Sequence, residues 1–291
     1  MTRPLISIIV PVKTTNSYIK NDLIPAIKQQ IYKNHEFIII TDKILKAGPA
    51  AKRDFAAKKA KGSILAFIDS DAYPHKNWLK HTLPHFKNKN ISAVCGPGLT
   101  PPSNNLFQQV SGLVWSTWLG AGGAGTYRNR PEPTRFVDDY PTFNLLVRKK
   151  DFQAINGFDS NFWPGEDTKL CHDLVYKLKK KIVYDPKVQV FHHRRPIFIP
   201  HLKQISRYGL HRGYFTKILP KTSKRLGYFI PLFFLIGLIL FPYLILPPYI
   251  ILLFLTSFKH HSLLLIPAIF LTHLIYSLMF LKGLLTKNLL H

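Results

Sequence analysis

Two aspartates, Asp69 and Asp71, stand two residues apart directly after the apolar run from Ile64 to Ile68. Carboxylate oxygens at this spacing can converge on one hard divalent cation, and a magnesium or manganese ion held in this way can bridge a diphosphate. The same pattern also occurs in solvated turns that bind nothing. The place of the pair at the end of an expected buried strand favours the metal site over the turn.

Three further acids stand where they could do chemistry. Asp42 follows another apolar run and can hydrogen-bond a base or a ribose, although an ordinary turn aspartate is the simpler interpretation. Glu166 and Asp167 open an expected helix, whose dipole stabilises a carboxylate at that end. They can act as a helix cap, or as a general base that takes a proton from an acceptor hydroxyl. Phe162 and Trp163, just before them, offer flat surfaces for a sugar ring.

Later residues add weaker signals. His192 and His193 follow an apolar run, and either imidazole can bind a metal ion, although a histidine pair without that role is the more common case. Gln204, Arg207 and Tyr208 lie in a basic stretch. Arg207 can clamp a leaving diphosphate, because guanidinium matches phosphate geometry, or it can be one more arginine on a membrane-facing helix.

The elements that must position these residues alternate between strand and helix. We expect strands at 5–12, 35–41, 64–68, 91–96, 143–148, 181–184 and 188–192, and helices at 19–30, 50–61, 77–87 and 166–180. This alternation predicts an α/β fold with a doubly wound, mostly parallel sheet, in which ligands bind at the carboxyl ends of the strands. Asp42 and the pair Asp69 and Asp71 fall at that edge. The Gly- and Pro-rich residues 97–135 are expected to form a long loop or lid.

The charge of the chain is strongly positive and unevenly spread. Its formal net charge is +25, from 40 Lys and Arg against 15 Asp and Glu, and no acid follows Asp185. Such an excess predicts a polyanionic partner: nucleic acid, an anionic membrane surface or a phosphorylated substrate. The chain has no zinc-ligand spacing and no RNA-stacking aromatic motif, so we expect no nucleic acid partner.

The last hundred residues predict membrane contact. Residues 194–225 are basic and aromatic, as in a segment at a membrane interface, and 226–291 are expected to form a transmembrane hairpin of spans near 228–256 and 262–281. A three-pass path, divided at Pro247 and Pro248, is the alternative. Basic residues at both ends of the hairpin predict a multi-pass cell-membrane protein with a cytoplasmic catalytic domain. The N-terminal apolar run is too short for a secretory signal, and the two cysteines are expected to be free.

In their order, these motifs resemble glycosyltransferase family 2, whose members are inverting enzymes with the GT-A nucleotide-sugar fold. The resemblance covers residues 5–208. The matching stretches are SIIVPV from Ser7, RDFAAKKAKGSILAFIDSDAYP from Arg53, GFDSNFWPGEDTKLC from Gly157 and YDPKVQVFHH from Tyr184. The resemblance implies a catalytic domain at 1–193 that uses a nucleotide-sugar as co-substrate and a divalent metal, Mn or Mg, as cofactor.

The resemblance also implies roles for single residues. Asp167 would be the catalytic base with Glu166 beside it, and Asp71 would hold the metal together with His192 or His193. The motif from Gln204 to Tyr208 is similar to the Q-x-x-R-W motif of processive synthases, with Tyr in place of Trp. Six residues would serve nucleotide-sugar binding or the leaving group: Pro11, Asp42, Arg53, Asp69, Gln204 and Tyr208, with Arg207 assisting departure of the diphosphate.

The implied reaction is a single displacement in which the acceptor hydroxyl attacks the anomeric carbon and inverts it. We expect a UDP-sugar donor and a lipid-linked or cell-surface glycan acceptor at the cytoplasmic face of the membrane. The alternatives are a polyprenyl-phosphate sugar synthase and a non-catalytic membrane scaffold with the same fold. The sequence does not choose the sugar, the acceptor, the metal or the oligomeric state.

Overall fold

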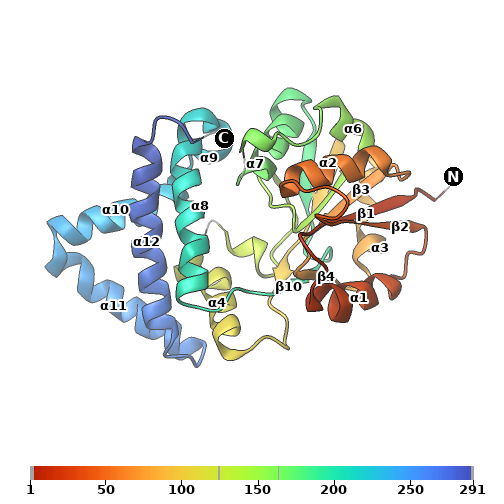
Figure 1. The fold of residues 1–291 in the computed structure, drawn as a ribbon. Helices are drawn as coiled ribbons and strands as arrows, with labels where there is room; N and C mark the ends of the chain where they lie inside the picture. Colours follow the sequence, from red (N-terminus) through yellow and green to blue (C-terminus); the bar gives the residue numbers. More distant parts are fainter. Residues whose placement is uncertain (1–2, 124, 163, 290–291) are drawn as a thin grey trace. The chain divides into compact units, whose positions relative to one another are not determined.

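The computed structural model describes residues 3–123, 125–162 and 164–289 (Figure 1). The chain divides into two compact units. Unit 1 contains residues 1–99 and 130–192, and unit 2 contains residues 100–129 and 193–289. The sequence-based boundary between domains, at residue 193, did not anticipate that residues 100–129 would group with the C-terminal part.

Unit 1 is an α/β domain built on a seven-stranded sheet of order β2-β1-β3-β8-β5-β9-β7. Five of these strands run in one direction, which confirms the expected mostly parallel sheet, while β7 and β8 run against them. The strands are β1 (Ile6–Pro11), β2 (His35–Ile40), β3 (Ile64–Ile68), β5 (Ile91–Cys95), β7 (Arg135–Val137), β8 (Asn144–Arg148) and β9 (Lys181–Tyr184). Every residue of β1, β3 and β5 is buried, as expected for strands covered on both faces.

Helices cover both faces of this sheet. They are α1 (Ile24–Lys28) with the π-helical turn Ile19–Leu23 before it, α2 (Pro49–Lys59), α3 (Trp78–Thr82), α6 (Lys149–Ala154) and α7 (Glu166–His172) with the π-helical turn Asp173–Lys177 after it. Figure 1 shows α2, α6 and α7 on one side of the sheet and α1 and α3 on the other. Right-handed crossovers from β1 to β2 and from β2 back to β3 require α1 and α2 to lie on opposite faces. Because α2 follows β2, its N-terminus lies at the edge of the sheet where β3 also ends.

A second, three-stranded sheet of order β4-β10-β6 extends unit 1 beside the acidic pair. Its strands are β4 (Ala72–Pro74), β6 (Gly98–Leu99) and β10 (Val190–His192). In the antiparallel pairing of β10 with β4, His192 stands opposite Ala72. This register brings a residue near the end of unit 1 next to the turn that follows β3.

The prediction of a long loop at 97–135 is wrong, because much of that stretch is helical. It contains α4 (Leu106–Ser116), α5 (Trp118–Ala121) and the short 3-10 helix Thr126–Arg128. Asn105 begins α4 with a capping box, in which its side chain accepts from the Gln108 backbone N–H and the Gln108 side chain accepts from the Asn105 N–H. That signal was present in the sequence, and the abundance of Gly and Pro around it concealed it.

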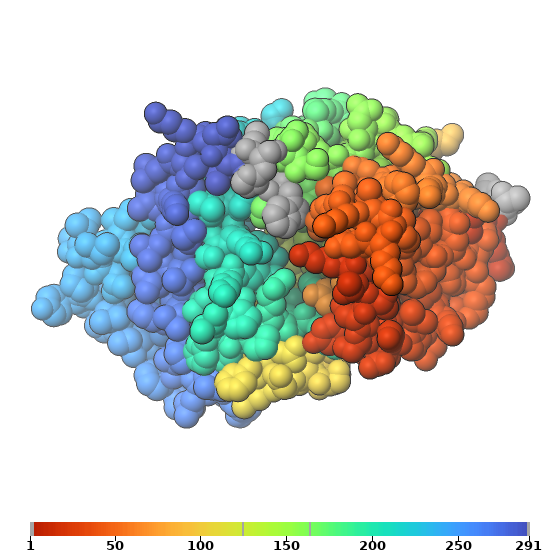
Figure 2. Space-filling view, in the orientation of Figure 1, coloured from red at the N-terminus to blue at the C-terminus, as the bar shows by residue number. Residues whose placement is uncertain are grey.

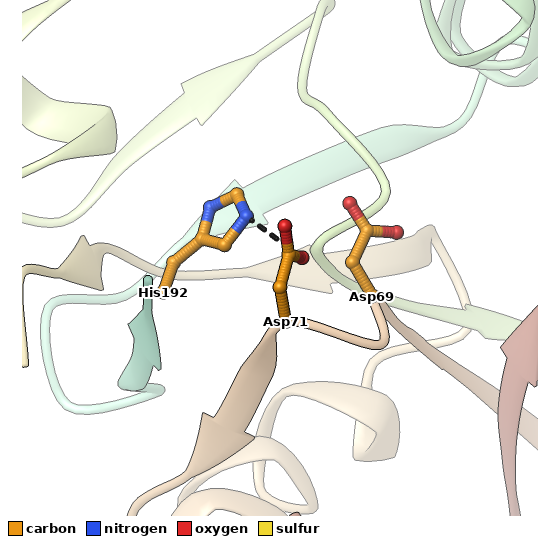
Figure 3. A group of neighbouring side chains, drawn as sticks. All are labelled: Asp69, Asp71 and His192. Carbon is orange, nitrogen blue, oxygen red and sulfur yellow. Dashed lines mark hydrogen bonds and ion pairs between the residues drawn. The ribbon is translucent and has the colours of Figure 1, made fainter. Parts of the chain in front are cut away.

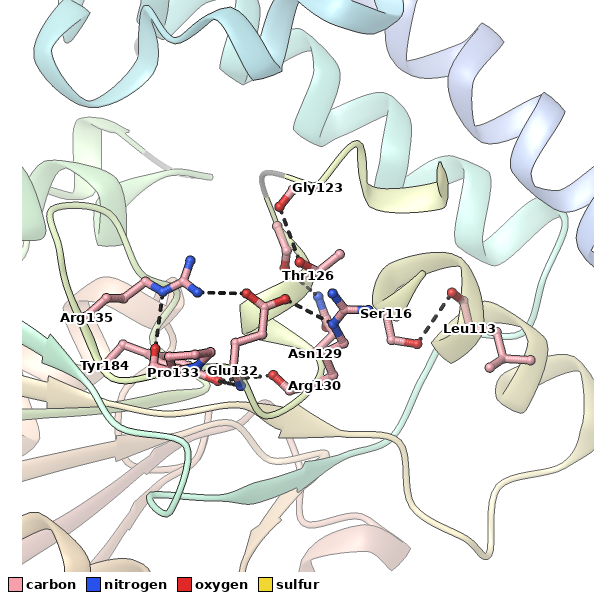
Figure 4. Close-up of polar contacts among 11 residues, drawn as sticks. Leu113, Ser116, Gly123, Thr126, Asn129, Arg130, Glu132, Pro133, Arg135 and Tyr184 are labelled. Atoms are coloured by element: carbon pink, nitrogen blue, oxygen red, sulfur yellow. Dashed lines mark hydrogen bonds and ion pairs between the residues drawn. The ribbon is translucent and has the colours of Figure 1, made fainter. Parts of the chain in front are cut away.

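The two ends of this stretch are fixed by local contacts (Figure 4). In unit 2, Thr126 Oγ1 donates to the Gly123 carbonyl over 3.3 Å. In unit 1, Glu132 accepts from Arg130 Nε at 3.0 Å and from an Arg135 guanidinium nitrogen at 2.9 Å. The Tyr184 hydroxyl, at the end of β9, accepts from the Glu132 N–H at 3.2 Å. Within unit 1, the segment from Arg130 to Arg135 is therefore held to the sheet through Glu132 and Tyr184.

Unit 2 is completed by five helices: α8 (Ile199–Ile218), α9 (Pro220–Ser223), α10 (Leu226–Leu240), α11 (Pro242–Lys259) and α12 (Leu265–Leu285). The apolar block expected as a first span is divided between α10 and α11. The division falls at Phe241 and Pro242, whereas Pro247 and Pro248 lie inside α11. Both α11 and α12 are long and apolar enough to cross a membrane, and α10 is shorter.

Candidate active site

Asp69, Asp71 and His192 form one group at the carboxyl end of β3. Each offers one ligand atom, and these atoms lie within 4.8 Å of one another. His192 Nε2 is 3.2 Å from Asp71 Oδ1. Figure 3 shows the imidazole and the two carboxylates converging from the β3–β4 turn and from β10. The sequence predicted that the acids would meet at this edge, and the small sheet adds the histidine.

The chemistry of this group suits a divalent cation. Burial raises the pKa of the Asp69 carboxyl, the Arg53 guanidinium lowers it and the Asp71 carboxylate raises it further. A cation between the two carboxylates would offset their repulsion. His192 Nδ1 is buried and has no hydrogen-bond partner among the described residues. Two carboxylate oxygens with one imidazole nitrogen suit manganese well, while magnesium prefers an all-oxygen set.

Arg53 connects this group to the start of α7. From α2, one guanidinium nitrogen lies 2.8 Å from Asp69 Oδ1 and the other 3.1 Å from Glu166 Oε1. Arg53 and Glu166 are both buried, with 4% and 6% of their surfaces exposed. The guanidinium also lies over the ring of Phe158 at 5.6 Å. The buried Arg53 guanidinium therefore holds the Asp69 and Glu166 carboxylates close to each other, although they lie far apart in the chain.

Asp167 lies next to Glu166 in the first turn of α7. Burial raises the pKa of its carboxyl to about 7, and the Glu166 and Asp139 carboxylates reinforce this effect, while the Thr168 backbone N–H and Arg53 oppose it. The Thr168 hydroxyl donates a hydrogen bond to Asp139 Oδ1 over 2.8 Å. Burial and the nearby Glu166 and Asp139 carboxylates thus leave the Asp167 carboxyl poised between its neutral and charged forms near neutral pH.

Asp42 follows β2 and makes an ion pair with Lys52 from α2. Lys52 is 2% exposed, and its Nζ also donates to the Val12 carbonyl over 2.6 Å. Val12 follows Pro11, the buried last residue of β1. A buried lysine therefore connects Asp42 to Val12, the residue after Pro11.

The remaining predicted residues lie in unit 2. His193 Nδ1 is 2.6 Å from Asn104 Oδ1. Gln204, Arg207 and Tyr208 lie on α8, where the Gln204 side-chain amide donates to the Tyr208 hydroxyl over 3.0 Å. Their predicted roles in metal, donor or leaving-group binding stay predictions. Trp163 lies outside the described residues.

Sequence reasoning missed two side chains of this site, Lys52 and Asp139. Lys52 was one of many lysines in a basic helix, and only its burial beside Asp42 distinguishes it. Asp139 stands in the pair Asp138 and Asp139 shortly before β8, a signal similar to Asp69 and Asp71 but outside the expected strand ends. Its place beside Asp167 follows from the pairing of distant segments.

Comparisons with known proteins agree with this architecture. Residues 20–153 match the family model for Glycosyl transferase family 2. The chain is 28% identical over 150 residues to a pre-mycofactocin glycosyltransferase of Mycobacterium tuberculosis, a match covering 51% of this chain and 30% of that protein. It is 27% identical over 156 residues to glycosyltransferase AglE of Haloferax volcanii, covering 50% of this chain and 45% of that one. The matched region thus spans less than half the length of either relative.

The fold is shared with a solved structure as well. The mannosyltransferase PcManGT from Pyrobaculum calidifontis, in complex with GDP-Man and Mn²⁺, is similar with a TM-score of 0.59 at 13% identity, over 99% of this chain and 89% of that chain. This likeness shows a common GT-A-like fold. The match of residues 20–153 to the family model for Glycosyl transferase family 2 covers a little under half of the chain, and the GT-A-like fold agrees with it.

Proposed function

We propose that this chain is an inverting, metal-dependent glycosyltransferase that moves a sugar from a nucleotide-sugar to an acceptor held at a membrane. One observation carries the proposal. Arg53 joins the Asp69, Asp71 and His192 group to the helix that begins with Glu166 and Asp167. A cation-binding group and a carboxyl with a pKa near 7 therefore belong to one connected site, as a displacement with a phosphate leaving group requires.

The donor would bind along the carboxyl edge of the sheet. Asp42 and Lys52 would meet the base, beside Pro11, and Asp69 would contact the nucleotide. Asp71, Asp69 and His192 would hold a manganese or magnesium ion, which when bound would neutralise charge on the leaving diphosphate. Two named relatives are glycosyltransferases, and the similar solved structure holds GDP-Man and Mn²⁺. Our first expectation for the base is uracil, and the experiment below compares it with guanine and thymine.

Asp167 would take the proton of the acceptor hydroxyl. Its pKa of about 7 leaves a large fraction ionised at neutral pH while keeping the carboxylate basic enough to accept a proton. Glu166, paired with Arg53, is tied up as a counter-charge, so the two neighbouring acids have different environments. The hydroxyl freed in this way attacks the anomeric carbon on the face opposite the diphosphate, and the configuration inverts.

Membrane attachment is supported by the surface of unit 2. The helices α10, α11 and α12 expose many large apolar side chains, among them Phe233, Ile251, Phe258 and Leu285. No acid follows Asp185, and exposed lysines stand at the helix ends. An apolar surface of this extent with basic flanks fits an anionic membrane. We therefore propose a lipid-linked or cell-surface glycan acceptor at the cytoplasmic face of the cell membrane.

Nucleotide binding to the full chain in detergent tests the donor site. Thermal unfolding would be followed with UDP, GDP and dTDP, each with and without Mn²⁺, because a ligand that binds only the folded state raises the melting temperature. We expect stabilisation by one nucleotide that depends on Mn²⁺ and is lost in Asp71→Ala. The matched control is Asp159→Asn, an acid in another loop, which should retain the effect.

The outcomes separate the proposed function from its alternatives. A metal-dependent shift with one nucleotide, together with sugar transfer in the same preparation, supports the proposal and names the base. A folded chain that no nucleotide stabilises favours the non-catalytic scaffold. Transfer to a lipid phosphate that survives Asp167→Asn favours a polyprenyl-phosphate sugar synthase, because a phosphate acceptor needs no deprotonation by this residue.

A further inference from the structure

The helices α8 and α12 pack side by side along most of their lengths. His201 Nε2, near the start of α8, lies 3.0 Å from Thr272 Oγ1 in the first half of α12. Near their ends, Lys217 Nζ donates to the Thr286 carbonyl. Figure 1 shows the two helices aligned, and Figure 2 shows their side chains in direct contact on the face in view. At a rise of about 1.5 Å per residue, the paired stretch of α8 is about 24 Å long, most of the thickness of a bilayer core of about 30 Å.

Glycines make this contact unusually close. A Cβ on Gly213 would lie 2.1 Å from the Phe280 carbonyl oxygen, and one on Gly283 would lie 2.0 Å from the Leu210 carbonyl oxygen. A Cβ on Gly209 would lie 2.8 Å from the Tyr276 carbonyl oxygen. Backbones that meet in this way cannot shift past each other without a clash. If α12 crossed a membrane, α8 would therefore have to cross it alongside.

The composition of α8 is unsuited to the interior of a bilayer. Lys203, Arg207 and Lys217 are exposed along it. No Asp or Glu follows Asp185 in the chain, so α8 and the helices after it have no acidic side chain of their own to neutralise these cations. Cations within the hydrocarbon core are costly unless they pair or reach the surface. If α12 crossed the membrane upright, α8 would carry these charges through the core.

On the side of α12 opposite α8 lie the apolar helices α10 and α11. Figure 1 shows α12 between α8 and the pair α10 and α11. The rings of Phe229 and Phe280 lie 4.9 Å apart, and Ser257 Oγ donates to the Ser262 carbonyl over 2.7 Å, so both outer ends of the pair stay near α12. The junction of the two helices projects as an apex. Its large apolar side chains are among the most exposed in the described residues: Ile239 70%, Leu240 61%, Phe241 60%, Tyr243 95% and Leu244 71%.

We propose that unit 2 attaches to one leaflet only, with α12 lying along the membrane surface instead of crossing the bilayer. The pair α10 and α11 enters the hydrocarbon as a re-entrant wedge, and α8 faces water. The partner is a leaflet with anionic lipids, because exposed lysines stand at both ends of α12: Lys259 before it, and Lys282 and Lys287 at its end. In this arrangement all of them reach the headgroups of one surface. The inference rests on the membrane attachment in the proposed function and replaces the spanning hairpin expected from hydropathy.

Cysteine accessibility in sealed membrane vesicles tests this inference on the full chain. Cys95 and Cys171 are fully buried, so they can stay in place as a low background. The variants are Lys259→Cys before α12 and Lys287→Cys after it, with Lys61→Cys on an exposed loop of unit 1 as the reference. An impermeant maleimide is added with and without detergent. If α12 lies in the surface, all three cysteines react from the same side without detergent.

A crossing helix gives a different pattern. The proposal is overturned if Lys259→Cys reacts only after detergent opens vesicles in which Lys287→Cys already reacts, or the reverse. A second measurement uses fluorescence quenching by lipids with brominated chains. A fluorophore is attached to the cysteine of Lys203→Cys or of Tyr243→Cys in vesicles of these lipids. We expect quenching at 243 and none at 203, whereas quenching at both would place α8 in the core and also overturn the proposal. A chain that stays soluble on sedimentation would overturn membrane attachment itself, without touching nucleotide binding by unit 1.

Discussion

His192 and Asp71 lie 121 positions apart in the chain, yet the Nε2 atom of the histidine is 3.2 Å from Oδ1 of the aspartate. The pairing of β10 with β4 produces this contact, because it sets His192 opposite Ala72, the residue after Asp71. The ring of Phe143 stacks on the imidazole at a centroid distance of 4.9 Å and limits its rotation. The geometry of the proposed cation-binding group therefore depends on the small sheet as much as on the acidic pair.

His192→Gln should weaken metal binding while leaving the fold intact. We expect the apparent affinity for Mn²⁺, read from the metal-dependent rise in melting temperature with a nucleotide present, to fall by on the order of 10–100-fold. The matched control is His81→Gln, a histidine outside the group whose Nδ1 lies 2.9 Å from the Lys187 carbonyl oxygen. Equal Mn²⁺ affinity in wild type and His192→Gln would remove the histidine from the metal site.

The proposed transferase activity should depend on pH through Asp167. Because its pKa is raised to about 7, we expect kcat/KM to rise with pH up to about that value and then to level. Asp139→Asn removes a neighbouring negative charge, so the pKa of Asp167 should fall and the rising limb should move to lower pH. Asp138→Asn is the matched control, since Asp138 accepts instead from the Tyr176 hydroxyl at 2.5 Å. If the rising part of the kcat/KM profile moved equally in both variants, the pH dependence could not be assigned to Asp167.

The same carboxyl should make stability depend on pH in a defined direction. The pKa of Asp167 is raised from 3.8 to about 7 in the folded chain, so between these values the folded state holds a proton that the unfolded state has released. Stability from this group therefore falls as pH rises through that window. Asp167→Asn stays neutral, so its melting temperature relative to wild type should increase between acidic and mildly basic pH. A difference that does not change with pH would show that the carboxyl is not destabilised by folding.

Loss of Arg53 should be among the most destabilising single changes in unit 1. Arg53→Met leaves the buried Glu166 carboxylate without its partner, for which we expect a loss of about 3–5 kcal/mol of unfolding free energy. Arg53→Lys should lose less, because a charge remains near Asp69 and Glu166. Thermal unfolding in one detergent measures both. In the double variant Arg53→Met with Glu166→Gln, part of the stability should return, and the absence of any recovery would count against the buried ion pair.

Close packing of α8 on α12 predicts a strong effect at Gly283. A methyl group there would meet the Leu210 carbonyl oxygen at 2.0 Å, so Gly283→Ala must push the helices apart. We expect a loss of roughly 1–3 kcal/mol, as in overpacked cores. Gly48→Ala is the matched control, because nothing lies within 4 Å of a Cβ at that position and its φ of −65° suits alanine. Similar losses in both variants, by thermal unfolding, would show that the helices can adjust.

Local pattern was enough to predict the central elements of unit 1. The run Ile64–Ile68 forms β3 with the expected bounds, and β1, β2, β5, β8 and β9 lie within one or two residues of the expected strands. Most of these are buried runs of β-branched and apolar residues, whose strand preference is a property of the segment itself. Because parallel strands end at one edge, the sequence also predicted that Asp42, Asp69 and Asp71 would lie there.

Contacts between distant segments decided the rest. Arg53 was expected only to serve donor binding. Its pairing with both Asp69 and Glu166 was not predicted, because burial and not residue type decides which cation meets these carboxylates. The helix α4 was hidden by surrounding glycines and prolines. The length and apolarity of α12 predict a membrane span, and only its close pairing with the charged α8 argues for a different arrangement. Hydropathy is a property of one segment, whereas the depth at which a helix can lie in a membrane depends on what is packed beside it.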